Sequence, residues 1–270
     1  MDVFFSSTFD YGAAKQWTHA TEMFVVKLAA FYVVTIFSIK YFMRDRKPFD
    51  LQLPLNAWNA FLALFSVLGT LLLTPTFFGE IFNKGLTDSY CKINRSYTDN
   101  RAGYWTFLWV VSKIPELVDT IFIVLRKKPL MFMHWFHHVL TGYFAFISYS
   151  ADNAYMIWIV YLNYTVHAFM YSYYFLRSLR IRVPPQVARM ITASQIVQFL
   201  ITHVVMIHLA YITLVQGRQC DVTLKSYLVG AFMELAYLFL FSRFYYISYI
   251  AGGGKKFVNH KRLDEQQKVE

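Results

Sequence analysis

The chain has 270 residues, of which 57% are hydrophobic, 20% aromatic and only 16% charged. This composition excludes an ordinary soluble domain, in which about a quarter of the residues are charged. The formal net charge is +10, but the cations flank apolar stretches and form no long basic run, so nucleic acid is not an expected partner. The composition therefore predicts a polytopic membrane protein.

Seven stretches are long and apolar enough to cross a bilayer, which takes roughly 20 residues in helical form. We predict an all-α membrane protein whose seven transmembrane helices form a single domain over residues 24–250. Residues 1–23 precede this domain, and residues 251–270 form a glycine-led, charged tail with a composition typical of disorder. In chain order the predicted spans are 24–43, 58–77, 104–125, 130–149, 154–176, 187–214 and 227–250.

Lysine and arginine are concentrated after spans one, three, five and seven. Short cytoplasmic loops carry such an excess, so we predict a lumenal N-terminus and a cytosolic C-terminus. The long connection between spans two and three then lies in the lumen with Cys91 and the sequon Asn94-Arg95-Ser96, and Cys220 lies in another lumenal connection. We predict a Cys91–Cys220 disulfide, which that compartment permits, and glycosylation of Asn94. Two free thiols are the alternative.

Ionisable and amide side chains interrupt four of the spans, where such groups are costly and indicate a functional site by default. Counted at 1.5 Å per residue from the nearest cytoplasmic cation, Glu116, His137, His167 and Gln198 lie about 15 Å deep. We therefore predict one buried reaction chamber that opens toward the cytosol; for single groups, a polar network that fastens helices is the alternative. The candidates are Lys113, Glu116 and Asp119 in span three, His134, His137 and His138 in span four, Asn163, His167, Tyr171 and Tyr174 in span five, and Gln195 and Gln198 in span six.

Three kinds of chemistry would use such a chamber. A di-iron desaturase or hydroxylase binds its metals through several histidine boxes, because first-row metals at such sites take many nitrogen or oxygen ligands, and the spans hold too few histidines. A lipid transporter explains buried charge but not imidazoles beside carboxylates. Acyl transfer uses every motif, since imidazole can act as nucleophile or base and amides can stabilise an oxyanion. We predict no metal site.

Four motifs together resemble the signature set of the ELO family, the elongases of very long chain fatty acids, across spans two to seven in order and spacing. Pro115-Glu116-Leu117 and the box from His134 to His138 resemble the subgroup that acts on saturated and monounsaturated acyl chains. The motifs are Lys113-x-x-Glu116-x-x-Asp119-Thr120, His134-x-x-His137-His138, Asn163-x-x-x-His167-x-x-Met170-Tyr171-Ser172-Tyr173-Tyr174 and Thr192-x-x-Gln195-x-x-Gln198.

The resemblance implies the condensation of acyl-CoA with malonyl-CoA to 3-oxoacyl-CoA, carbon dioxide and CoA, without a cofactor. We expect a ping-pong reaction in which His137 attacks the acyl thioester to form an acyl-imidazole, and His167 binds or relays protons at the same centre. Glu116 and Asp119 are expected to orient the imidazoles, and His134 and His138 to complete the polar cluster. Substrate is expected to contact Lys113, Asn163, Tyr171, Tyr174, Gln195 and Gln198.

The resemblance also implies an acyl tunnel, and we expect spans two to seven to surround it. Residence in the endoplasmic reticulum membrane is a further implication, with the reductase and dehydratase of the elongation cycle, and a second copy of the chain in a homodimer, as partners. Cations at the cytoplasmic mouth would hold the phosphates of CoA through charge-assisted contacts; as single residues they are equally well explained as topology signals. They are Arg126, Lys127, Lys128, Arg177, Arg180, Lys255 and Lys256.

Overall fold

The computed structural model describes residues 3–4 and 6–251, and the elements assigned there are helices. The predicted all-α class is therefore confirmed, whereas Lys255 and Lys256 lie outside the described residues. The longer helices are α1 (Tyr11–Phe42), α2 (Gln52–Lys84), α5 (Ala102–Ser112), α6 (Val118–Leu125), α7 (Phe132–Ser150), α8 (Met156–Ser178), α9 (Pro185–Leu214) and α10 (Leu224–Tyr245). The short ones are α3 (Asp88–Cys91), α4 (Arg95–Thr98), the 3₁₀ turn η1 (Pro115–Leu117) and the π-helical segment η2 (Tyr246–Ala251).

Four helical segments of the described chain are long and apolar enough to cross a membrane, by length and composition: α1, α2, α9, and α10 together with η2. The three other predicted spans correspond to α5 with α6, to α7 and to α8. These are the segments that carry the candidate ionisable residues, with Lys113 and Glu116 between α5 and α6, His137 on α7 and His167 on α8. The presence of ionisable residues, together with the break between α5 and α6, therefore distinguishes these segments from the four apolar ones.

The third predicted span is not one helix. Pro115 has no backbone N–H to donate to the Val111 carbonyl one turn earlier, and Ile114 N donates to that carbonyl instead, at 3.1 Å. Helix α5 consequently ends at Ser112, and α6 begins only at Val118 after the turn η1. The break places the side chains of Lys113 and Glu116 together in the interior, where both are buried.

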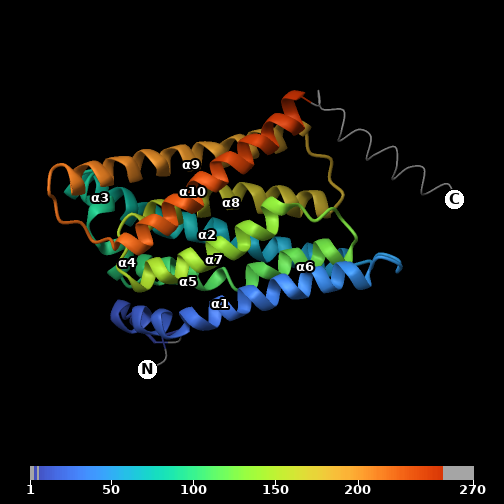
Figure 1. The fold of residues 1–270 in the computed structure, drawn as a ribbon, viewed down its shortest axis with the longest axis horizontal. Helices are drawn as coiled ribbons and strands as arrows, with labels where there is room; N and C mark the ends of the chain where they lie inside the picture. Colours follow the sequence, from blue (N-terminus) through green and yellow to red (C-terminus); the bar gives the residue numbers. More distant parts are fainter. Residues whose placement is uncertain (1–2, 5, 252–270) are drawn as a thin grey trace.

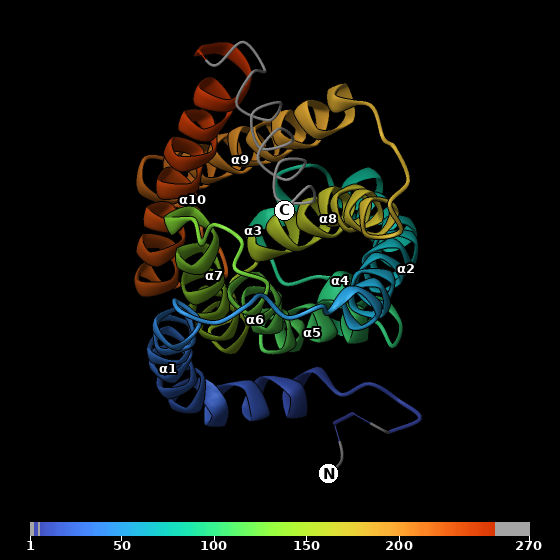
Figure 2. The ribbon, with the colours of Figure 1, turned by 90° about the vertical axis from the view of Figure 1, so that its right-hand side faces the viewer.

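The helices form a ring with α1 outside it (Figure 2). Around the ring, α7 packs on α10, α10 on α9, α9 on α8, α8 on α2, α2 on α5, and α5 on α7. Helix α1 packs mainly on α7 and also contacts α6. It begins at Tyr11, earlier than the predicted residue 24, because the Asp10 carboxylate caps it by accepting a hydrogen bond from Ala13 N. The predicted N-terminal segment is thus partly helical.

Consecutive long helices run back and forth, so the connections gather at two ends of the molecule (Figure 1). One end contains α3, α4 and the α7–α8 and α9–α10 connections, and we call it the disulfide end because Cys91 and Cys220 are bonded there, as predicted. Asp221 strengthens the link, since its N–H donates to the Cys91 carbonyl at 2.7 Å. The opposite end contains the α1–α2, α6–α7 and α8–α9 connections, and we call it the basic end.

The sequon in the loop at the disulfide end is folded into the structure, where the Asn94 side chain makes hydrogen bonds to the backbone. Asn94 is 5% exposed, and it caps α4 by accepting a hydrogen bond from Ser96 N at 2.9 Å. Its side-chain amide donates to the Ser89 carbonyl at 3.1 Å. The predicted glycan would be attached to this same nitrogen, so glycosylation and these hydrogen bonds compete for one atom.

Candidate active site

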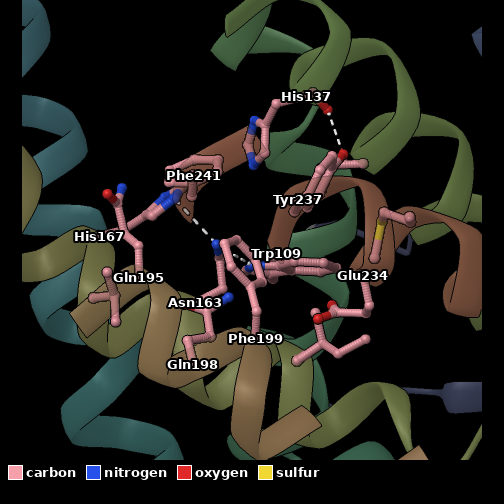
Figure 3. Close-up of a pocket in the computed structure, with 14 residues that line it drawn as sticks. Trp109, His137, Asn163, His167, Gln195, Gln198, Phe199, Glu234, Tyr237 and Phe241 are labelled. Atoms are coloured by element: carbon pink, nitrogen blue, oxygen red, sulfur yellow. Dashed lines mark hydrogen bonds between the residues drawn. The ribbon is translucent and has the colours of Figure 1, made fainter. Parts of the chain in front are cut away.

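A pocket inside the ring is lined by α5, α7, α8, α9 and α10. Five of the predicted site residues face it together, from three different helices: His137, Asn163, His167, Gln195 and Gln198. Figure 3 shows these side chains around the pocket, with Trp109, Tyr237 and Glu234 beside them. The predicted convergence of polar groups from different spans therefore holds for these five.

A chain of hydrogen bonds determines the protonation pattern of His167. Trp109 Nε1 donates to Asn163 Oδ1 at 2.8 Å, and an indole nitrogen can only donate. The Asn163 amide nitrogen must then point the other way, where it lies 3.0 Å from His167 Nε2. Because the amide nitrogen donates, Nε2 accepts and the neutral ring carries its hydrogen on Nδ1. His167 thus has an N–H to offer, while its Nε2 lone pair is occupied.

The ring of His137 is held differently from that of His167. Among the described residues, neither nitrogen of its ring takes part in a hydrogen bond; the contacts hold its backbone and the face of its ring instead. Tyr237 OH donates to the His137 carbonyl at 3.0 Å, and Thr141 Oγ1 lies 2.7 Å from the same hydroxyl. The Tyr237 ring centre is 4.9 Å from that of His137. The imidazole is therefore positioned in the pocket with its nitrogens open to a substrate.

Lys113 and Glu116 form a buried ion pair that does not line this pocket. Lys113 Nζ donates to Glu116 Oε1 at 2.6 Å, and Ser112 Oγ donates to the same oxygen at 2.8 Å. The ammonium group also lies 4.5 Å from the centre of the Trp109 ring, a cation–π geometry. The pair consequently supports Trp109, and through it Asn163 and His167, without direct access to the pocket.

Asp119 likewise does not line the pocket and is connected to His167 through Tyr171. Trp58 Nε1 donates to one carboxylate oxygen, and Tyr171 OH donates to the other at 2.9 Å. The Tyr171 ring packs edge-on against His167, with 5.2 Å between ring centres. Asp119 thus joins α6 to α2 and α8 and stabilises the wall behind His167, whereas Tyr174 is 46% exposed and does not line the pocket.

The three histidines of span four do not share one cavity. His138 faces a second cavity that Lys113 also lines, on the side of α7 toward α1. The rings of His134 and His138 are 4.7 Å apart, and His134 Nε2 is buried without a hydrogen-bond partner in the part of the chain that the structure describes. Within residues 3–4 and 6–251, no group of three His, Cys, Asp or Glu side chains is arranged to hold a metal ion.

Comparison with known proteins identifies the family. The family described as ELO, the GNS1/SUR4 family, matches residues 17–257. This chain belongs to the ELO family. It is 48% identical to long chain fatty acid elongase 1 of Caenorhabditis elegans over 230 residues, 85% of this chain and 80% of that one. It is 36% identical to very long chain fatty acid elongase 6 of Homo sapiens over 246 residues, 91% of this chain and 92% of the human protein.

A second nematode relative agrees with the first. Long chain fatty acid elongase 2 of Caenorhabditis elegans is 43% identical over 225 residues, which are 83% of this chain and 82% of the relative. These matches confirm the resemblance inferred from the four motifs, and they do not favour the di-iron or transporter alternatives.

The pocket of this ELO-family protein also contains residues that the sequence reasoning missed. Trp109 and Tyr237 line it and orient the two histidines. Glu234, on α10, lines it as well and is 1% exposed. The signal for Glu234 was present, because it is a carboxylate inside the predicted span 227–250 and such groups indicate a site by default. Trp109 and Tyr237 gave no comparable signal among the many aromatic residues.

The predicted phosphate-binding cations differ in their exposure and in whether their charged groups already make hydrogen bonds. Lys127 Nζ donates to the backbone carbonyls of Arg44 and Arg46, both at 3.0 Å, and so fastens the α1–α2 connection to the α6–α7 connection. Lys128, Arg177 and Arg180 are exposed at the basic end, and Arg126 is half-buried there.

Gln195, deeper on α9, donates to Met170 Sδ at 3.4 Å.

Proposed function

We propose that this protein is a fatty acid elongase that condenses acyl-CoA with malonyl-CoA to give 3-oxoacyl-CoA, carbon dioxide and CoA. Membership of the ELO family supports the activity, as do relatives named as long and very long chain fatty acid elongases. The observation that carries the chemistry is the open imidazole of His137 beside the Trp109–Asn163–His167 chain.

In the first half-reaction, a ring nitrogen of His137 attacks the acyl thioester, the carbon–sulfur bond breaks, and CoA leaves as the thiolate. The leaving thiolate takes up the N–H proton that the ring loses, and the acyl group remains on the imidazole. The thioester oxygen gains negative charge during the attack, and the Nδ1–H of His167 with the amides of Gln195 and Gln198 can stabilise it. His167 acts here as a hydrogen-bond donor, since its Nε2 lone pair is occupied by Asn163.

In the second half-reaction, malonyl-CoA enters and loses carbon dioxide, and the resulting carbanion attacks the acyl carbon. A carbon–carbon bond forms, the carbon–nitrogen bond to His137 breaks, a proton from solution restores the neutral imidazole, and 3-oxoacyl-CoA leaves. The absence of water matters at both stages, because an acyl-imidazole is hydrolysed readily. The apolar residues Ile159, Phe199 and Phe241 line the same pocket and would serve this purpose.

The membrane arrangement extends this proposal. All seven predicted spans cross the endoplasmic reticulum membrane, with the disulfide end in the lumen and the basic end in the cytosol. The disulfide and the charge distribution support this orientation. CoA phosphates bind at the basic end to Arg126, Lys128, Arg177 and Arg180, with Lys127 contributing less because its amine is engaged. The residues 24–250 act as one domain.

The substrate is a saturated or monounsaturated long-chain acyl-CoA, and its tail extends from His137 toward the disulfide end, within the ring of α2 and α5–α10. No cofactor takes part. The reductase and dehydratase of the elongation cycle receive the product, and a second copy of the chain is a further partner.

Two measurements test the function. Microsomes that contain the protein should convert a panel of acyl-CoAs to products longer by two carbons only when malonyl-CoA is present. The purified protein, incubated with acyl-CoA alone, should release CoA and gain the mass of one acyl group, and His137→Ala should abolish both. A His137→Ala protein that condenses at the normal rate would overturn the mechanism, and transport into liposomes without use of malonyl-CoA would overturn the function.

A further inference from the structure

The pocket contains a carboxyl group that the proposed reaction does not use. Glu234 is buried on α10 and lines the same pocket as His137 (Figure 3). Thr202 Oγ1, on α9, lies 2.5 Å from Glu234 Oε2. The second carboxyl oxygen, Oε1, is buried and has no hydrogen-bond partner in the described residues. Buried polar atoms are nearly always paired in folded proteins, so this oxygen requires an explanation.

The hydrogens available around Glu234 indicate that its carboxyl group is neutral. Thr202 has one hydroxyl hydrogen, but besides Glu234 its oxygen lies 3.0 Å from the Phe199 carbonyl and 3.2 Å from the Gln198 carbonyl. An ionised Glu234 would take that hydrogen and still hold a charge that no described Lys, Arg or His pairs with, which is costly in apolar surroundings. A protonated Glu234 donates its O–H to Thr202, and Thr202 donates to Phe199. In that form Oε1 is a carbonyl oxygen and can only accept.

Glu234 lies beyond the reacting centre, on the side away from the basic end. The rings of Tyr237 and Phe241 contact His137, and α10 runs from the disulfide end toward the basic end. Glu234 precedes Tyr237 by nearly one turn, about 5 Å along the helix, and Tyr237 lies between His137 and Glu234 in Figure 3. The other hydrogen-bond donors of the substrate near the thioester are the amide N–H groups of CoA, and in the proposed arrangement CoA enters from the basic end, on the opposite side of His137. The group nearest Glu234 is therefore the acyl chain, a few carbons from the thioester.

We propose that Glu234 and Thr202 form a subsite for a hydroxyl group on the acyl chain, so that the enzyme elongates hydroxyacyl-CoA. The substrate hydroxyl donates to Glu234 Oε1 and supplies the partner that this oxygen lacks. An unsubstituted chain would cover Oε1 with methylene groups and leave it unpaired, and sites that bind a substrate hydroxyl discriminate against the analogue without it. This subsite rests on the proposed elongase function.

The test uses the purified full-length protein with malonyl-CoA and measures kcat/KM for hexadecanoyl-CoA and its hydroxy isomers. In these isomers the hydroxyl is moved one carbon at a time along the half of the chain nearest the thioester. We expect at least one isomer to exceed hexadecanoyl-CoA by about 10-fold, the size of one buried hydrogen bond. If hexadecanoyl-CoA exceeds every isomer, or if an ordered water fills the position so that all rates are equal, the subsite is wrong.

Two variants assign the preference to Glu234. Glu234→Gln keeps a carbonyl acceptor and a donor toward Thr202, so the ratio between the best isomer and hexadecanoyl-CoA should stay within about 3-fold of its original value. Glu234→Leu removes the acceptor, and the ratio should fall to one or below. An unchanged ratio in the leucine variant overturns the proposal. Should that variant not fold, Thr202→Val, which removes the anchor of the carboxyl group, must lower the same ratio.

Failure of the elongase function and failure of the hydroxyl subsite would give different results. If no acyl-CoA of either kind gives a malonyl-dependent product, the elongase function fails. If condensation proceeds but the ratio does not depend on residue 234, the subsite alone fails.

Discussion

Trp109 Nε1 donates to Asn163 Oδ1 at 2.8 Å, and this single bond determines which way the Asn163 amide faces His167. The donor belongs to α5, whereas Asn163 and His167 lie one turn apart on α8. The tautomer of His167 therefore depends on the packing of two helices. The Lys113–Glu116 pair beside the Trp109 ring supports the same contact from behind.

Trp109→Phe should lower the rate of condensation while keeping most of the core packing. The phenyl ring keeps most of the packing, but Asn163 loses its donor and its amide becomes free to turn. A buried polar group left unpaired costs about 1–3 kcal/mol, so we expect kcat/KM to fall about 10-fold or more. Steady-state kinetics with labelled malonyl-CoA would measure the fall.

Trp105→Phe is the matched control for that change, because Trp105 is one turn away on the same helix and packs against Phe65 and Tyr164. We expect it to leave kcat/KM within about 2-fold, as the loss is packing alone. Equal losses in the two variants would contradict the role assigned to the indole N–H of Trp109.

The buried ion pair should behave as a coupled unit. Lys113→Met leaves the Glu116 carboxylate without its cation, and breaking a buried pair in this way costs about 3–5 kcal/mol. Adding Glu116→Gln to Lys113→Met removes the uncompensated charge and should recover part of the stability. Thermal unfolding of the single and double variants in detergent would measure this coupling. Additive losses would show that the two side chains do not act together.

An exposed ion pair provides the control for this cycle. Arg95 and Asp99 are 3.4 Å apart near the surface of the disulfide end. Their double-variant cycle should show coupling of at most about 1 kcal/mol, because solvent screens exposed pairs.

The disulfide should contribute to stability but not to catalysis. Cys91 and Cys220 are separated by 129 residues and are bonded at the end of the molecule away from the basic loops. Replacing both by serine should cost about 2–5 kcal/mol of unfolding free energy, and KM for acyl-CoA should not change at temperatures where the variant is folded. A changed KM in the folded variant would show that this end of the molecule controls the pocket.

Asn94 should carry no glycan when the protein is made in cells with an active glycosylation pathway. Endoglycosidase treatment should leave the mobility of the protein unchanged. Asn94→Ala should lower stability by about 1 kcal/mol through loss of the helix cap, with a further loss from the unpaired Ser89 carbonyl.

Ser96→Ala separates the sequon from the cap. It destroys the glycosylation signal, but Ser96 Oγ is buried and makes no hydrogen bond within the described chain, so this variant should be close to neutral. If both variants lose stability equally and the mobility shifts on endoglycosidase treatment, the glycan is present and our interpretation of Asn94 is wrong.

The local sequence determined the helices and the inventory of polar groups. Apolar length predicts where each helix lies, and intramembrane charge indicates Glu116, His137 and His167 as candidates. Alternating topology placed Cys91 and Cys220 on the same side of the membrane, which permitted their pairing, and the structure shows that they are bonded. These features depend on residues close together in the chain or on which side of the membrane a loop lies.

Only the packing of helices decided which candidates meet. His137 and His138 are neighbours in the sequence, yet they face different cavities, because consecutive residues on a helix point about 100° apart and the rotation of α7 is set by its contacts with α1 and α10. Glu234 and Thr202 meet for the same reason, across α9 and α10. Helical spacing defines a face, but the partner of that face is a property of the whole fold.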